Sequence, residues 1–245
     1  MHFHLPKPLH GWREFAGEVG IIVVGVLIAL GAEQVVEDLR WRHEVGEAKA
    51  ALRDEIYGHS YGATEVAVAE PCVDQQLMQL EKALLAPGPY KPVPLYAERQ
   101  SFRFTYRAPA RSWSDNVWRS MVGQGVTSHF DRDLQLQLAG HYSQVVEQAQ
   151  RVAQADAIMF RMRVLAQPIQ PDPATRIALA AELEQARGIY ELMTLVSNEL
   201  LRDAQDMGFP PDTKSIAKDL RTSGTLTFCR AHHLPLGTPN AQAPR

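Results

Sequence analysis

The sequence predicts an all-α protein in which an N-terminal transmembrane helix is followed by an antiparallel helical bundle. Two observations support this prediction: an apolar segment at residues 15–32, and long stretches in which apolar residues recur alternately three and four positions apart. Proline-rich turns separate those stretches. We therefore expect a short tail at 1–14, a membrane-spanning helix at 15–32, a helical domain at 33–234 and a disordered tail at 235–245.

Residues 15–32 read FAGEVGIIVVGVLIALGA, the one segment of this sequence that is apolar enough for lipid. These 18 residues, at about 1.5 Å each, give roughly 27 Å of helix, close to the ~30 Å hydrocarbon core of a bilayer. Glu18 is the single charged side chain, and it lies one turn from the end, where it reaches the interface. Gly25 and Ala29 form a small-xxx-small pair that favours helix packing in lipid, and hence a homodimer.

Two other interpretations of this segment stay open. A cleaved signal peptide would use Lys7 and Arg13 as its charged region, Val19–Leu30 as its apolar region and Ala29-Leu30-Gly31 as its cleavage site. A buried core helix is the other interpretation, because the uncharged run of 14 residues is short for a membrane span.

Two signals disagree about topology. Four Lys or Arg residues at positions 40–53 follow the span and two precede it, so the positive-inside rule alone favours a cytoplasmic C-terminus. Cys72 and Cys229 favour the other side of the membrane, because a distant pair without CxxC or metal-ligand spacing suits one disulfide in an exported domain. Two unrelated buried thiols are the alternative. We favour a single-pass protein of the bacterial inner membrane with a periplasmic C-terminal domain.

Composition narrows the classes of partner. The chain is 45% hydrophobic and 22% charged, with a formal net charge of −3. A nucleic-acid-binding protein needs a basic face, so we expect no nucleic-acid partner. The membrane is the partner that the sequence predicts, together with a second copy or another membrane protein.

The first part of the body is expected to continue the membrane helix outward. Apolar residues keep helical spacing from Glu33 to about Ala69, and Pro71 is expected to interrupt the helix. A second helical segment follows, with one apolar face formed by Val73, Leu77, Leu80 and Leu84. Residues 86–94 contain four prolines and form a loop, and residues 95–107 alternate enough for a short strand or extended edge.

The second part contains the most regular helices. Residues 112–118 read SWSDNVW and offer N-cap residues for a short helix that Gly123 and Gly125 end. Asp131 caps a helix that runs to about residue 166, and a helix at about 174–207 follows a proline turn. A short polar helix or turn covers 212–221. The large side chains on these faces are expected in the core, namely Met159, Phe160, Met162 and Met193.

Motifs of catalysis and metal binding are weak in this chain. Ser215-Ile-Ala-Lys218 matches SxxK and Ser114-Asp115-Asn116 matches SDN, but their order and spacing do not suit a penicillin-binding fold. Glu55 and His59 are four apart, which is usually a solvated contact on a helix. We expect no catalytic residue, no metal site and no cofactor, and we predict a non-enzymatic protein.

Two stretches of the chain resemble a group of uncharacterised bacterial single-pass membrane proteins. One is GEVGIIVVGVLIALGAEQ at 17–34, where a Gly-Glu pair opens the span; many members carry Gln-Ile-Asn-Asn where this chain has Gly-Ala-Glu-Gln. The other is 113–142, with a Trp, a Gly near 125, an Asp-Arg-Asp-Leu start and a terminal Tyr. Together they cover about 50 of the 245 residues. The resemblance implies an anchored helical domain and no particular reaction.

The function we expect first is partner binding or self-assembly in the bacterial envelope. A ligand-binding sensory bundle that needs a separate output partner is the second expectation, and a hydrolase with an unrecognised site around 113–118 is the third. The resemblance makes four residues of that segment the candidate functional surface: Trp113, Asp115, Asn116 and Trp118. The competing interpretation is that both tryptophans belong to the core.

Overall fold

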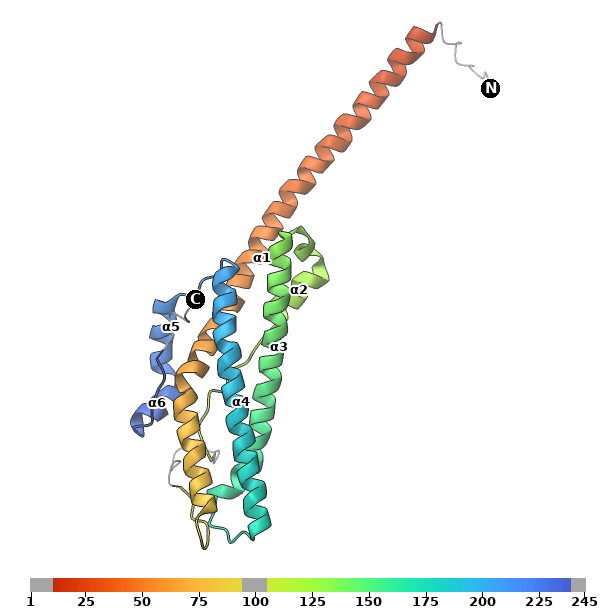
Figure 1. Ribbon diagram of the computed structural model, residues 1–245. Helices are drawn as coiled ribbons and strands as arrows, with labels where there is room; N and C mark the ends of the chain where they lie inside the picture. Colours follow the sequence, from red (N-terminus) through yellow and green to blue (C-terminus); the bar gives the residue numbers. More distant parts are fainter. Residues whose placement is uncertain (1–10, 94–104, 239–245) are drawn as a thin grey trace, which may run out of the picture. The chain divides into compact units, whose positions relative to one another are not determined.

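The computed structural model describes residues 11–93 and 105–238, and the regular secondary structure within those ranges is helical (Figure 1). This confirms the predicted all-α class. An isolated bridge between Tyr90 and Ile169 is the extended pairing within the described residues. The chain divides into two compact units, 1–49 and 50–245, and each is described by itself.

The first unit contains the beginning of α1, a helix that runs from Trp12 to Leu85. The predicted span at 15–32 lies inside it. Its apolar side chains are exposed, from 41% for Val19 to 76% for Ile21, so this segment is not the core of the described protein. By length and composition this one helix of the described residues is apolar enough to cross a membrane. The coarse prediction of a membrane-crossing helix near the N-terminus therefore has structural support.

The predicted interruption at Pro71 is wrong, because α1 continues through this proline. Proline removes one backbone hydrogen bond and costs about 3 kcal/mol in a helix interior. Packing outweighs that cost here, since Ala69, Cys72 and Val73 are each at most 1% exposed. Nearby, the Val68 carbonyl accepts a hydrogen bond of 2.9 Å from the Gly237 N–H. Tertiary contacts therefore keep helical a sequence that local propensity would end.

The bundle of the second unit consists of the C-terminal half of α1, α3 (Arg132–Arg161) and α4 (Pro173–Asp206) (Figure 1). Helix α4 is antiparallel to α3, as shown by the contact of Gln148 with Ser197 and that of Arg161 with Glu182. It is also antiparallel to α1, because Arg187 binds Asp74 whereas Arg176 binds the carbonyl of Leu84. Helices α1 and α3 consequently run in the same direction, and the chain between them must return along the bundle.

Short helices complete the described fold. Helix α2 (Asn116–Gln124) and the 3-10 turn η1 (Val126–His129) precede α3, and η2 (Met162–Ala166) follows it. Helix α5 (Thr213–Asp219) and η3 (Leu220–Thr222) match the short polar helix that the sequence predicts. Helix α6 (Gly224–Ala231) was not predicted. Gly125, with φ of 76°, ends α2 in the left-handed conformation that glycine tolerates best.

Three further predictions change. Residues 95–104 lie outside the described residues, and 105–107 do not form a strand. The tail expected to be disordered from 235 is described as far as 238. Within it, Leu236 packs against a small core cluster of Val68, Ala69, Ile216, Leu220 and Leu226.

Phe160 was expected in the core but is 56% exposed, whereas Met159, Met162 and Met193 are buried. Because each helical residue turns about 100°, Met159 and Met162 share a face that Phe160 cannot.

Cys72 of α1 and Cys229 of α6 form a disulfide, with their Cα atoms 6.1 Å apart. Both cysteines are fully buried. The bond closes a loop of 157 residues and attaches the C-terminal helices to the middle of α1. It therefore constrains nearly the whole second unit.

We expect that reducing this disulfide lowers the free energy of unfolding by about 2–5 kcal/mol, because the unfolded chain regains the entropy that the closed loop removes. Urea unfolding followed by circular dichroism, with and without dithiothreitol, measures the difference. The double variant Cys72→Ser/Cys229→Ser is the control, and reductant should not change its stability. Equal wild-type stability under both conditions would contradict the disulfide.

Candidate functional site

Residues 105–115, called the connection below, are the described irregular segment that leads from α1 toward α2, and side chains from α1 and α6 bind its backbone. The Gln76 side chain accepts a hydrogen bond from the Arg107 N–H at 2.7 Å and donates one to the Arg107 carbonyl at 3.0 Å. Thr225 of α6 donates to the Ala108 carbonyl at 3.1 Å. A buried connection needs such partners, because an unpaired backbone polar group in the interior costs as much as a lost hydrogen bond.

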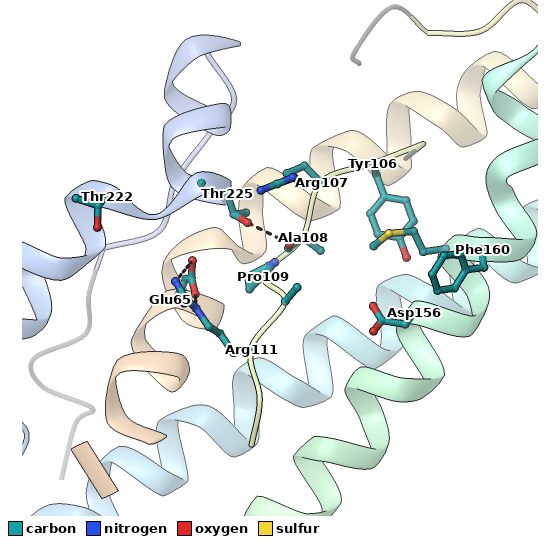
Figure 2. Close-up of a pocket in the computed structure, with 13 residues that line it drawn as sticks. Glu65, Tyr106, Arg107, Ala108, Pro109, Arg111, Asp156, Phe160, Thr222 and Thr225 are labelled. Atoms are coloured by element: carbon teal, nitrogen blue, oxygen red, sulfur yellow. Dashed lines mark hydrogen bonds and ion pairs between the residues drawn. The ribbon is translucent and has the colours of Figure 1, made fainter. Parts of the chain in front are cut away.

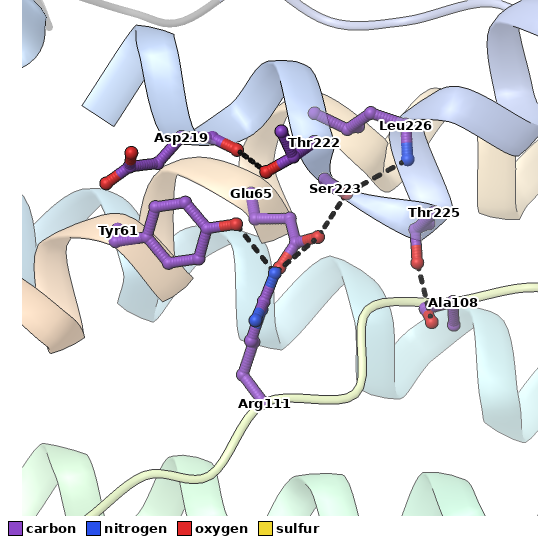
Figure 3. A network of polar contacts seen from close by, with 9 residues as sticks. All are labelled: Tyr61, Glu65, Ala108, Arg111, Asp219, Thr222, Ser223, Thr225 and Leu226. Carbon is purple, nitrogen blue, oxygen red and sulfur yellow. Dashed lines mark hydrogen bonds and ion pairs between the residues drawn. The ribbon is translucent and has the colours of Figure 1, made fainter. Parts of the chain in front are cut away.

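A charged pair holds the next residues of the connection (Figure 3). The Arg111 guanidinium donates to Glu65, whose side chain is only 2% exposed, and the shortest N–O distance is 2.5 Å. Ser223 also donates to Glu65, and Arg111 donates to the Tyr61 hydroxyl at 2.6 Å. Because these donors surround the buried carboxylate, its negative charge is compensated within the protein. The cluster joins α1, the connection and the start of α6.

Beside this cluster lies a half-open cavity of about 500 Å³ (Figure 2). Its volume falls in the range of small-molecule sites, about 300–1,000 Å³. Residues of α1, the connection, α3, η3 and the first turn of α6 form its walls. The lining includes three large aromatic or apolar side chains, Tyr106, Met159 and Phe160. It also includes four charged side chains, Glu65, Arg107, Arg111 and Asp156.

Asp156 is the acidic group of this cavity that has no partner among the described residues. Its carboxylate makes no hydrogen bond or ion pair within the described part of the chain, and Figure 2 shows it directed from α3 toward the connection. Partial burial raises the pKa of Asp156, with no opposing contribution from a nearby cation. A carboxylate kept in a partly desolvated position without a counter-ion favours binding of an external cation or hydrogen-bond donor.

Arg107 approaches the cavity wall from the opposite side. Its guanidinium lies against the first residue of α6, so that a Cβ added to Gly224 would lie 2.8 Å from Arg107 Nη2. Ser223 caps this helix by accepting from the Leu226 N–H at 3.1 Å. A guanidinium beside the N-terminus of a helix gives this side of the cavity a positive potential.

The four residues of the predicted surface do not form one exposed patch. Trp113 is buried and stacks at 6.2 Å on His59, and Trp118 stacks at 5.3 Å on Tyr142. Asp115 pairs with Arg119 at 3.1 Å, and Asn116 accepts from the same arginine at 2.8 Å. The structure therefore places both tryptophans in packing positions, with the two polar residues toward solvent.

Glu55 and His59 are not the solvated pair that their spacing suggested. The Glu55 carboxylate accepts hydrogen bonds from Tyr142 at 2.8 Å and from the Val117 N–H at 3.1 Å. It thereby caps the N-terminus of α2, whose own N-cap residue, Asp115, makes no capping bond. Burial and Glu55 raise the pKa of Tyr142, so its hydroxyl remains protonated and continues to donate.

His59 and His141 form a buried pair in which both rings are neutral. His59 Nε2 lies 2.7 Å from the Ser114 carbonyl, which can only accept, so this nitrogen carries the proton. His59 Nδ1 then accepts from His141 Nε2 at 3.1 Å. His141 Nδ1 is left without a proton and without a partner in the described structure. Burial, and then the neighbouring His59, lower the pKa of His141 to about 3.

The weak sequence motifs have structural explanations. Ser215 donates to Asp212 at 2.7 Å within the cap of α5, so its SxxK pattern is a helix start. In the SDN segment, Asp115 forms an ion pair with Arg119, four residues further on. Among the described residues, no cluster of three or more His, Cys, Asp or Glu side chains has the arrangement of a metal site.

A scan against protein-family models, a search of curated proteins and a search of solved structures each found no significant match. The cavity therefore has to be interpreted from its own chemistry.

Sequence reasoning missed the residues of the cavity. Arg107, Arg111 and Asp156 belong to no motif, and they come from two segments that only the fold brings together. A signal was present in Asp156, an acidic residue close to the buried helical positions Ala155, Ile158 and Met159. An acid so near an apolar face is a candidate for a partly buried carboxylate.

We expect Arg111→Ala to lower the free energy of unfolding by about 3 kcal/mol, because it leaves the buried Glu65 carboxylate without its cation. The matched control is Arg161→Ala, whose pair with Glu182 is solvent-exposed and should contribute at most about 1 kcal/mol. Urea unfolding of both variants gives the two values. Equal effects would show that Glu65 does not depend on Arg111.

The histidine pair predicts acid sensitivity. An unfolded histidine titrates near pH 6.5 and the folded pKa of His141 is about 3. The unfolded state therefore binds protons that the folded state does not, and stability falls as the pH drops below about 6.5, by up to about 1.4 kcal/mol per pH unit.

Comparing urea unfolding at pH 7 and pH 5 tests this expectation. His141→Gln removes the titrating ring and keeps an N–H donor for His59, so its stability should fall less with acid than that of the wild type. His233→Gln changes an exposed histidine and should behave like the wild type. The same loss of stability in His141→Gln as in the wild type would contradict a neutral buried pair.

Proposed function

We propose that this chain is a single-pass, membrane-anchored helical domain of the bacterial envelope that works by binding a small molecule. The observation that carries the proposal is the half-open cavity of about 500 Å³. It presents, beside apolar side chains, a carboxylate that has no partner among the described residues. Binding sites of this kind are concave and mostly preformed, with a few polar groups that orient the ligand. A ligand-binding sensory bundle with a separate output partner fits this description.

Two observations support the anchor and the compartment. The apolar side chains between Val19 and Leu30 are exposed, which is stable in lipid and costly in water. The buried disulfide between Cys72 and Cys229 favours an oxidising compartment. A periplasmic bundle on an inner-membrane anchor accounts for both, and the Gly-Glu opening at 17–34 resembles that of bacterial single-pass membrane proteins.

Partner binding or self-assembly is the second candidate. It is favoured by two exposed leucines one turn apart on α4, Leu192 at 54% and Leu195 at 55%. The Gly25–Ala29 pair within the span offers a further helix-packing contact. Crosslinking through a cysteine at position 192, in a background without Cys72 and Cys229, would detect a dimer in membranes.

We expect the full chain to remain in the membrane fraction after carbonate extraction, with an intact N-terminus by mass spectrometry. A C-terminal alkaline phosphatase fusion should be active and a C-terminal green fluorescent protein fusion dark, because the first folds outside the cytoplasm and the second inside it. The reverse pattern would place the bundle in the cytoplasm, and a soluble intact chain would contradict the anchor.

Binding itself is measured on the purified full chain in detergent. A thermal-shift screen with a broad set of small metabolites should raise the melting temperature for at least one compound, because a ligand that binds the folded state stabilises it. No shift across the whole set, from a chain that is folded and disulfide-bonded, would contradict the binding function.

A further inference from the structure

We propose that two copies of this chain pair in parallel through the first unit, along one face of α1 that runs from Ile22, inside the predicted span, to His43, beyond it. The partner is a second copy of the same chain. This inference rests on the proposed membrane anchor, which holds both copies in the same orientation. It does not depend on the proposed ligand.

The pairing face, called the seam below, is a heptad repeat. Its positions alternate three and four residues apart without a break, namely Ile22, Gly25, Ala29, Ala32, Val36, Leu39 and His43. Because this spacing averages about 3.5 residues, the positions keep facing a partner helix in a left-handed coiled coil. Helix pairs in lipid mostly adopt the same left-handed crossing. One seam can therefore continue from lipid into water.

The part of the seam beyond the span needs a cover that lipid does not supply. Val35, Val36 and Leu39 are each at least 59% exposed in the described structure. Leu39 lies seven residues after Ala32, which at about 1.5 Å per residue is roughly 10 Å along the helix. The headgroup layer adds only about 5–7 Å on each side of the hydrocarbon core. Leu39 of a single copy would therefore face water, whereas a second copy would cover it.

The polar side chains of the same segment lie on the face of α1 opposite the seam. Gln34 donates to Asp38 at 3.2 Å, and Trp41 donates to Glu37 at 3.3 Å. The helix that follows the span is therefore amphipathic, with a hydrogen-bonded polar face and an exposed apolar face. The acidic residues Glu37 and Asp38 also keep this segment out of the hydrocarbon.

Two polar side chains lie on the pairing face, one toward each end. Glu18, four residues before Ile22, lies one turn from the end of the span, where its carboxylate reaches water. His43 is exposed and contacts Glu47 at 3.3 Å. A polar residue at a core position of a coiled coil fixes the register of the two helices. His43 therefore suits a parallel pair without any shift between the copies.

Charge complementarity favours a second copy as the partner. In a parallel coiled coil, the residue just before one seam position faces a residue five positions later on the other helix. Arg42 precedes His43, so it faces Glu47 of the other copy. Within one helix Arg42 and Glu47 lie about 140° apart and do not meet. The ion pairs described for this segment involve Arg40 and His43 but not Arg42.

Cysteine scanning of the full chain in native membranes tests the seam. Each position from 35 to 43 is replaced by cysteine in turn, and the membranes are oxidised with copper phenanthroline before a non-reducing gel. Cys72 and Cys229 remain, because they are buried and bonded to each other, and the unmodified chain controls for their reactivity. We expect Val36→Cys, Leu39→Cys and His43→Cys to form dimers at least about fivefold more than Asp38→Cys and Trp41→Cys, which lie on the opposite face.

Charge reversal tests whether the partner is a second copy in parallel. The dissociation constant of the dimer is measured by analytical ultracentrifugation of the full chain in detergent. Arg42→Glu and Glu47→Arg should each raise it by about tenfold, because two attractive contacts become repulsive. The double variant Arg42→Glu/Glu47→Arg should return it to within about twofold of the wild type. Glu44→Arg, which reverses a charge away from the seam, is the control and should leave it unchanged.

The outcomes separate this inference from the proposed function. Dimers at no position, equal yields around the helix, crosslinks to a different protein, or a double variant that stays weak would each overturn the parallel pair. If carbonate extraction releases the chain, the anchor fails and the pairing fails with it. If the chain stays in the membrane and crosslinking does not follow the seam, this inference fails alone. A compound that raises the melting temperature of a monomeric Leu39→Glu variant would show that binding stands without the pair.

Discussion

The second unit depends on one constraint: an irregular connection lies inside a helical bundle, and its polar backbone must find partners there. Helices α1 and α3 run in the same direction, so the chain has to return between them. Polar side chains of α1 make that return stable, with Gln76 bound to both backbone groups of Arg107 and Glu65 bound to the Arg111 side chain. The His59 ring donates a hydrogen bond to the carbonyl of Ser114, near the end of the connection. Without these partners the connection would leave unpaired backbone groups in the interior, each costing as much as a lost hydrogen bond.

The same constraint creates the cavity. A connection held by side chains cannot fill the space between helices as closely as a fourth helix would, and the gap at 106–111 is lined by the groups that hold it. Glu65 and Arg111 compensate each other there, so they form a wall rather than a ligand contact. Asp156, which has no partner among the described residues, remains as the acidic group of the lining. The disulfide between Cys72 and Cys229 keeps α6, and with it Gly224 and Thr225, against this wall.

Most of the helices could be predicted from the sequence, whereas the residues of the cavity could not. Apolar periodicity located α3 and α4 within a few residues, because their buried faces repeat regularly along the chain. The same reasoning failed at Pro71, where packing outweighs the lost hydrogen bond, and at Glu55 and His59, whose spacing resembles that of a solvated pair. Spacing along a helix does not reveal whether a polar residue faces water or an irregular segment of the same chain. Trp113 and Trp118 show a related difficulty, because the sequence does not reveal whether a tryptophan belongs to a functional surface or to the core. In the structure Trp113 packs on His59 and Trp118 packs on Tyr142.

The amino-acid sequence by itself determined the helical class, the apolar span near the N-terminus and the positions of the long bundle helices. These features follow from interactions between residues close in sequence and from the free energy of burying or exposing apolar side chains. Both can be predicted from the local pattern of the sequence. Tertiary structure alone decided that Cys72 meets Cys229, that Glu55 of α1 caps α2, and that Arg107 and Asp156 line one cavity. Such contacts join residues far apart in the chain, and their energies depend on distances and desolvation that exist only once the bundle has formed.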